Sequence, residues 1–297
     1  MHKFLRSIGF SGIKTNKELN KLLNLTTSLA DTKMYAENGE DIVAAEYYKE
    51  FGENMGLIVR GEYDENNDFQ SSYYFPVLRG YGITSTEDIS IERQAEKEAY
   101  AGVCDDVKVG VTLIFYLQNM IPYIKYKNTN MLPIRGTTLT LSALASQGTI
   151  MMPIVKNESD VARGKQVASN RNRLIAQARS GDESAMESLT LEDMDTYTHI
   201  SKKLRTEDVF TIVDTFFMPY GVECDQYSIM GEIQAVRTII NSYTEEKVYQ
   251  MTLLCNELQF DVCINAEDLL GEPMEGRRFK GLVWMQGYIN YPEMISE

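Results

Sequence analysis

The sequence is poor in the residues that most often carry catalysis and metal binding. Its 297 residues include two histidines, one tryptophan and four cysteines. The cysteines Cys104, Cys224, Cys255 and Cys263 form no C-x-x-C pair, whereas a structural zinc site needs about four ligands, usually at close paired spacings. We therefore expect no metal, no cofactor and four reduced thiols.

Long apolar runs are also missing. The longest surrounds VGVTLIFYL, Val109 to Leu117, and is far short of the roughly 20 residues that a membrane helix needs. The N-terminal stretch MHKFLRSIGFSGIKTNKEL lacks the sustained apolar region and small-residue cleavage site of a signal peptide. These absences predict a cytoplasmic protein that does not enter a membrane.

Positive charge is scarce as well: 29 basic residues stand against 43 acidic ones, a net charge of −14. The net charges of residues 1–157, 158–206 and 207–297 are −3, 0 and −11. The last third therefore repels polyanions, which counts against general nucleic-acid binding.

The patterns predict an α+β fold with three parts. Residues 1–157 are expected to form an antiparallel sheet domain with helices on one face, at 15–30 and 40–52. Thr15 or Asn16 would cap the first helix. Polar turns at 64–68, 103–106 and 145–148 lie between runs of β-formers and predict three hairpins.

Residues 158–206 change to helix formers and are expected to be a helical connector. A first helix rich in arginine precedes an acidic stretch, and Gly181 marks a protease-sensitive turn within Ala178–Ser184. These helices are either two solvated faces that attract one another or a docking surface.

Residues 207–297 return to five strand-like runs and predict a small antiparallel barrel or sandwich, with an OB-like barrel as the nearest common plan. One detail disagrees with an OB-fold. Only "NE" separates the third and fourth runs, and the helix-like AEDLLG falls before the last run instead.

The only tryptophan lies in GEPMEGRRFKGLVWMQG, Gly271 to Gly287, together with the densest basic cluster. This segment runs into a strand, whereas a phosphate-binding P-loop runs into a helix, so its glycines are better explained as turn positions. On that strand Val283, Met285 and Ile289 should face the core. The candidate ligand-binding residues share the other face: Arg278, Lys280, Trp284 and Tyr288.

Cations interleaved with aromatics are able to stack bases or sugars and to hold a phosphate. The alternative, which the acidic surroundings favour, is that this face packs against the rest of the protein with Trp284 shielded from solvent.

Catalytic signals are weak. No G-x-S-x-G motif occurs and no cysteine has an activated context. The best candidates are Glu223 and Asp225, two carboxylates that would project to one side of an extended segment and bind a metal or do acid–base work.

Four stretches together resemble an uncharacterised protein family of clostridial bacteria that is described only as a domain of unknown function. They are FLRSIGFSGI, YAGVCDDVKVGVTLIFYLQN, FMPYGVECDQYS and GEPMEGRRFKGLVWMQG. The resemblance spans the chain and implies an intracellular bacterial protein, and it transfers no catalytic or binding residue.

The sequence leaves three hypotheses open. The leading one is a non-enzymatic binding or adaptor protein with a protein partner or a homo-oligomeric state. The second is an enzyme that uses Glu223 and Asp225. The third is nucleic-acid or sugar binding by the Trp284 face.

Overall fold

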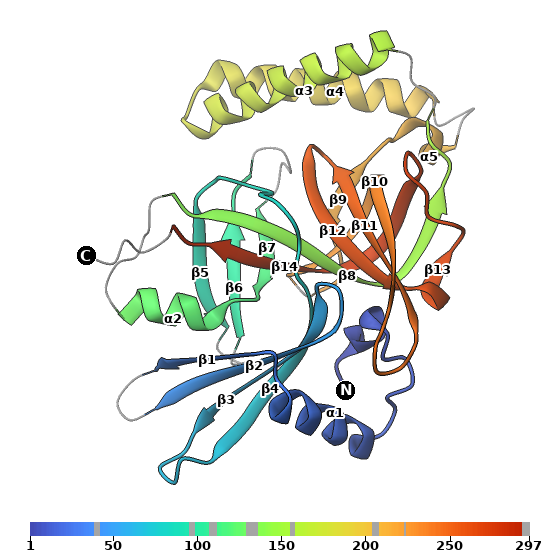
Figure 1. Ribbon diagram of the computed structural model, residues 1–297. Helices are drawn as coiled ribbons and strands as arrows, with labels where there is room; N and C mark the ends of the chain where they lie inside the picture. Colours follow the sequence, from blue (N-terminus) through green and yellow to red (C-terminus); the bar gives the residue numbers. More distant parts are fainter. Residues whose placement is uncertain are drawn as a thin grey trace.

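The computed structural model describes residues 1–38, 42–94, 99–106, 112–128, 136–154, 158–203, 208–222 and 224–292. Within them the chain forms a four-stranded sheet, a ten-stranded sheet and the helices that surround them, which confirms the α+β class (Figure 1). The helices are η1 (Lys3–Ile8), α1 (Asn16–Ser28), α2 (Met120–Asn128), α3 (Glu158–Arg179), α4 (Glu183–Lys203), α5 (Val209–Ile212) and η2 (Ala266–Asp268).

The first sheet is an antiparallel meander in the order β1-β2-β3-β4. Its strands are β1 (Thr32–Glu37), β2 (Val43–Gly52), β3 (Met55–Tyr63) and β4 (Phe69–Leu78). The expected hairpin at 64–68 joins β3 to β4. Helix α1 packs against β2 and β3, as expected for helices on one face of the sheet. Thr15 begins this helix with a capping box, in which its hydroxyl accepts from Glu18 N and the Glu18 carboxylate accepts from Thr15 N.

The second sheet contains the remaining strands. They are β5 (Ile89–Gln94), β6 (Ala99–Cys104), β7 (Leu113–Leu117), β8 (Thr138–Met151), β9 (Phe216–Pro219), β10 (Gln226–Ile240), β11 (Lys247–Cys255), β12 (Leu258–Asn265), β13 (Leu269–Leu270) and β14 (Arg278–Asn290). Strands β6 and β7 pair antiparallel, as expected for a hairpin near 103–106, but Val103 and Cys104 belong to β6. The single strand expected before that turn is divided into β5 and β6, which pair with each other.

Five strands of this sheet close into a barrel, which confirms the barrel expected from the sequence. Strands β12, β11, β10 and β14 are neighbours in that order, and β8 pairs with both β12 and β14 to complete the circle. The closing strand β8 thus comes from residues 138–151, upstream of the helical connector. Its pairing with β12 is parallel, and its pairing with β14 is antiparallel.

The barrel has the spatial strand order of an OB-fold, but the strand that takes the place of its fifth strand, β8, comes before the other four in the sequence. Reading round the circle gives β10, β11, β12, β8 and β14, with a parallel contact only between β12 and β8. If β10 is taken as the first strand, η2 lies between the third strand, β12, and the fourth, β14. That is where an OB-fold places its helix. The apparent disagreement in the sequence therefore disappears once β8 is recognised as the fifth strand.

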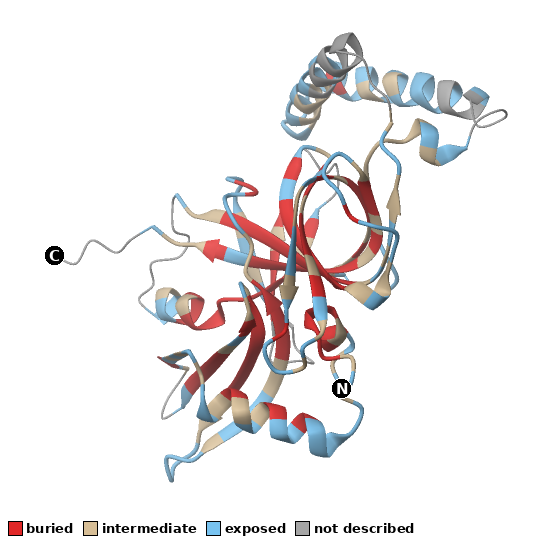
Figure 2. Ribbon diagram, turned by 45° about the vertical axis from the view of Figure 1, so that its right-hand side comes forward, coloured by how far each residue is buried: buried red, intermediate tan, exposed pale blue. Residues whose placement is uncertain are grey.

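Apolar side chains fill the barrel because alternate residues of each strand point inward. Met251, Leu253 and Cys255 of β11 are fully buried in one cluster, whereas Cys263 of β12 is buried in another. The predicted inward set of β14 is also confirmed: Val283, Met285 and Ile289 lie in the first cluster and Trp284 lies in the second. Figure 2 shows the buried residues concentrated in the barrel and in the sheet beneath it.

Three local predictions were wrong. Where a helix was expected at 40–52, residues 43–52 form strand β2, because pairing with β1 on one side and β3 on the other overrides the helical pattern; residues 40 and 41 lie outside the described residues. The hairpin expected at 145–148 does not form, and β8 continues through it with a bulge at Ser146. Gly148 there serves a close approach, since a Cβ atom would lie 2.3 Å from the Phe279 ring. The first strand run expected after 207 begins instead as helix α5, which Asp208 caps by accepting from Phe210 N.

The connector is helical, as predicted, and forms a hairpin of α3 and α4 that lies beyond one end of the barrel (Figure 1). The turn between the helices contains Gly181 with a φ of 93°, in the left-handed region that favours glycine. Among the residues that the structure describes, hydrogen bonds from Asn172 Nδ2 to Glu257 and from Arg179 Nη1 to Asp105 O connect α3 to parts of the protein outside the hairpin.

Candidate functional site

Trp284 lies at the centre of an aromatic cluster. Its side chain is 4% exposed, and its ring centroid is 5.5 Å from that of Phe4, 5.0 Å from Tyr116 and 6.4 Å from Phe75. These rings come from η1, β7 and β4, so the face packs against the first part of the chain. The expectation that Trp284 is shielded from solvent is confirmed.

The indole N–H of Trp284 donates a hydrogen bond to Asp225 Oδ2 over 2.7 Å. The backbone oxygen of Asp225 accepts from Met285 N, which fixes the segment before β10 against β14. Asp225 thus serves at least one packing function, as the acceptor of a buried donor. Its proposed catalytic partner, Glu223, lies outside the described residues, so catalysis by this pair stays a prediction.

Arg278 and Lys280 lie at the N-terminal end of β14, against the segment that follows the helical hairpin. The Arg278 guanidinium is buried and donates to the backbone oxygens of Phe210 and Val213 over 2.8 and 2.9 Å. Lys280 Nζ lies 4.1 Å from the centre of the Phe210 ring. Both cations therefore hold α5 to the barrel.

Tyr288 is 39% exposed and lies near the end of β14 where Asn290 is paired with Thr138. The four candidate ligand residues thus have three different environments along one strand. Whether any of them binds a ligand stays a prediction.

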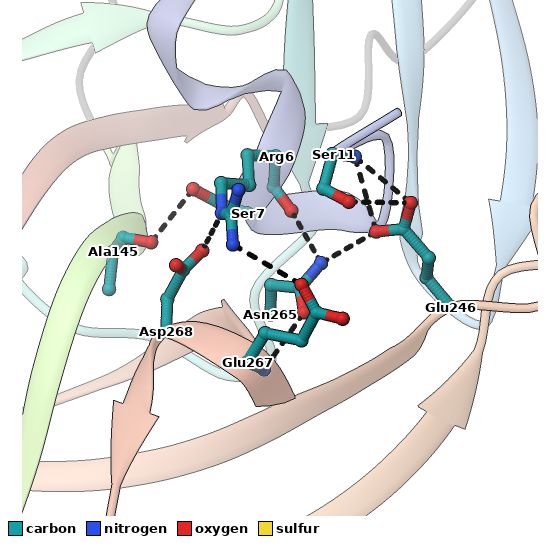
Figure 3. Close-up of polar contacts among 8 residues, drawn as sticks. All are labelled: Arg6, Ser7, Ser11, Ala145, Glu246, Asn265, Glu267 and Asp268. Carbon is teal, nitrogen blue, oxygen red and sulfur yellow. Dashed lines mark hydrogen bonds and ion pairs between the residues drawn. The ribbon is translucent and has the colours of Figure 1, made fainter. Parts of the chain in front are cut away.

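The N-terminal segment, residues 2–11, is fixed to the barrel by a polar network that sequence reasoning missed (Figure 3). Arg6 pairs with Asp268 and with Glu267, the second contact spanning 3.3 Å. Ser7 Oγ donates to Ala145 O over 2.8 Å. The partners are more than 130 residues away in the chain, so no local pattern connects them.

Glu246 extends this network. Its carboxylate accepts from Ser11 N over 3.1 Å and from Asn265 Nδ2 over 2.7 Å, and Asn265 Nδ2 also contacts Arg6 O (Figure 3). Asn241 Nδ2 donates to Ile8 O over 2.7 Å. Residues of the β10–β11 loop, β12 and η2 therefore bind the N-terminal segment through both its backbone and its side chains.

The position of the N-terminal segment matters because OB-fold barrels bind oligonucleotides and oligosaccharides on their second and third strands and on the loop between the first two. Here these elements are β11, β12 and the β10–β11 loop. Phe4, Leu5 and Ile8 share a buried cluster with Val248 of β11 and Cys263 of β12. The chain's own N-terminal segment lies where such barrels usually hold a ligand.

A buried ion pair lies between β2 and β3 of the first sheet, and its arginine also contacts the second sheet. Arg60 Nε and Glu46 Oε2 are 2.7 Å apart, and both side chains are 2% exposed. Arg60 also donates to Tyr116 Oη and to the backbone oxygen of Gln118. Burial raises the pKa of Glu46, and the Arg60 charge opposes that shift. The adjoining cavity has a volume of about 30 Å³, room for about one water molecule.

A second buried polar group lies beside β6. Ser85 Oγ donates to Asp106 Oδ2 over 2.6 Å, and Cys104 Sγ lies 3.8 Å from Ser85 Oγ. Burial raises the pKa of the Cys104 thiol to about 11, so the thiol stays protonated at neutral pH. A protonated, buried thiol is not an activated nucleophile.

In the part of the chain that the structure describes, no three His, Cys, Asp or Glu side chains gather as metal ligands. None of the helices described has the length and apolar character needed to cross a membrane. All four cysteines are free thiols. Cys104, Cys255 and Cys263 are buried, whereas Cys224 is exposed, which the sequence did not predict.

The α3–α4 hairpin presents a different kind of surface. Ala185 is its only buried side chain among those that the structure describes. Apolar side chains of α4 are instead left in solvent: Met186, Leu191, Met194 and Tyr197 are 46%, 58%, 63% and 75% exposed. Figure 2 shows the hairpin as predominantly exposed, in contrast to the barrel.

The fold and these sites define an α+β protein built on an OB-like barrel, with its N-terminal segment on the barrel face and a helical hairpin beyond it. The chain belongs to the family of the domain of unknown function DUF3881, described from a gene of E. rectale, whose model matches residues 5–287. No curated protein and no solved structure matches it.

Proposed function

We propose that the protein is a non-catalytic binding protein that docks to another polypeptide through its α3–α4 hairpin. The observation that carries this proposal is the α4 stripe, defined here as Met186, Thr190, Met194 and Tyr197. Spacings of four, four and three residues place these side chains on one side of a helix. All four are exposed.

A shallow, open hollow of about 370 Å³ lies along the stripe and is lined by Thr190, Asp193, Met194, Tyr197 and Thr198. Methionine and tyrosine are enriched at the centres of protein interfaces, and flexible methionines adapt to apolar partners. Acidic residues flank the stripe, since α4 contains five carboxylates and two lysines. The surface therefore fits a helix with an apolar stripe and basic edges.

Photo-crosslinking tests this proposal. A benzophenone side chain in place of Tyr197 should form covalent adducts with a protein in native lysate, because it lies in the docking surface. The matched control carries the same group in place of Tyr243, which is 50% exposed on the β10–β11 loop. We expect an adduct from position 197, none from position 243, and loss of the adduct when Met194→Glu is added. Equal labelling at both positions, or none at 197, would contradict the proposal.

A further inference from the structure

We infer that the partner on the α4 stripe is a second copy of this chain, and that two hairpins associate about a two-fold axis into a four-helix bundle. This inference rests on the proposed function and names its partner. It follows from three features of the hairpin: its lack of a core, its two opposite charges and its size.

The hairpin lacks the packing that normally stabilises helices. Helices in proteins owe most of their stability to burial of an apolar face, and isolated helices are marginal in water. Helices α3 and α4 have 22 and 21 residues, yet Ala185 is the only described side chain of the pair that is buried. Val167 of α3 is likewise an exposed apolar side chain, with 50% of its surface in solvent. A second layer of helices would bury these side chains.

The two helices carry opposite charges. Helix α3 contains five basic and two acidic residues, and α4 contains five acidic and two basic residues. Within one hairpin, Arg171 already pairs with Glu192 at 3.5 Å and with Asp193 at 2.7 Å. A surface that is basic on one helix and acidic on the other is complementary to its own copy turned by 180°. In that arrangement α3 of each chain faces α4 of the other, and the α4 stripes lie near the axis.

The available area suits a stable dimer. A helix of about 21 residues is about 32 Å long and about 10 Å wide. Two such helices side by side offer a flat face on the order of 600 Å², and side chains that project from this face increase its accessible area. Stable interfaces bury about 800 Å² on each side. Four-helix bundles pack helices of this length around apolar stripes. The groove of about 630 Å³ lined by Gln166, Val167, Asn170, Arg173 and Glu192 gives room for the side chains of a facing helix.

Light scattering on the purified full-length chain tests the inference. We expect a concentration-dependent mass that approaches twice the 33.8 kDa of the chain. Met194→Glu should raise the dissociation constant at least tenfold, because it places a carboxylate beside the same carboxylate at the axis. The matched control is Ser188→Glu, which adds the same charge to an exposed position on the other side of α4 and should leave the dimer intact. Unchanged Trp284 emission would show that the barrel is folded in both variants.

The possible failures are distinguishable. A monomer at every concentration up to the solubility limit would overturn the inference, and so would a dimer that Met194→Glu does not weaken. If such a monomer still gives position-197 adducts of another mass in lysate, the proposed function survives with a different partner. If no adducts form and the chain is monomeric, both the inference and the proposed function are wrong.

Discussion

The barrel and the helical hairpin of this protein use their apolar residues in opposite ways. In the barrel, residues such as Met251, Val262 and Met285 have no exposed surface. In the hairpin, Met194 and Tyr197 have more than half of theirs in solvent. Burying such side chains contributes roughly 1.5–3 kcal/mol each. The comparison therefore separates a region whose apolar residues stabilise the fold by burial from a region whose apolar residues stay exposed.

Trp284→Ala should have the largest effect, a loss of about 4 kcal/mol in the free energy of unfolding. It removes the centre of the aromatic cluster and leaves Asp225 without its indole donor. Urea unfolding followed by circular dichroism measures the loss. In the unaltered protein, the single tryptophan should show blue-shifted emission that acrylamide quenches poorly.

Tyr288→Ala on the same strand is the control, and its cost should stay within about 1 kcal/mol because that side chain is 39% exposed. A readily quenched Trp284 and an equal, small cost for both substitutions would show that the barrel face is open. The contrast between barrel and hairpin would then be lost.

Arg60→Met should cost about 3 kcal/mol, and the loss should grow with pH. Without the guanidinium, burial raises the pKa of Glu46 further, so the folded chain keeps this proton at pH values where the unfolded chain, with a pKa of about 4.3, has released it. Stability then falls as the pH rises from the unfolded pKa towards the folded one. Urea unfolding at about pH 5 and about pH 8 should therefore show the larger deficit at the higher pH.

The control for that experiment is Arg237→Met, since Arg237 pairs with Glu53 at the surface with side chains 43% and 55% exposed. An exposed pair contributes within about 1 kcal/mol. A loss of stability for Arg60→Met that is independent of pH would contradict this prediction. It would mean that other groups stabilise the ionised Glu46 carboxylate in place of Arg60.

Local signals in the sequence predicted the elements whose cause is local. Thr15 and Glu18 form the capping box that begins α1, and the polar residues 64–68 form the turn between β3 and β4. The alternation in β11 and β12 correctly separated Cys255 from Cys263. These features depend on neighbours within a few residues.

The features with distant causes were not predictable. Strand β8 closes the barrel by pairing with Asn290 and Asp261, residues more than 100 positions away, and its Ser146-Gln147-Gly148 segment imitates a turn. The network around Arg6 likewise needs Asp268 and Glu246 to be brought to the N-terminal segment by the barrel. At the hairpin, Met194 and Tyr197 are three residues apart in the sequence, which places them on one side of a helix, but their exposure depends on what packs against α4.

The smallest effect is expected from a cut in the turn of the hairpin, residues 178–184. This turn is exposed, contains Gly181 at positive φ and joins two helices with little buried surface. Limited proteolysis should cut there first and give fragments of roughly 180 and 115 residues.

The division of the chain into separate parts at 157 and 206 also stays a prediction, and the behaviour of the fragments tests it. Since β8 belongs to the first fragment and pairs with β12 and β14 of the second, we expect the nicked protein to elute as one particle with unchanged Trp284 emission. The fragments should separate only in denaturant. First cuts within the β3–β4 hairpin, or fragments that part in native buffer, would show that the barrel does not hold the chain together across the hairpin.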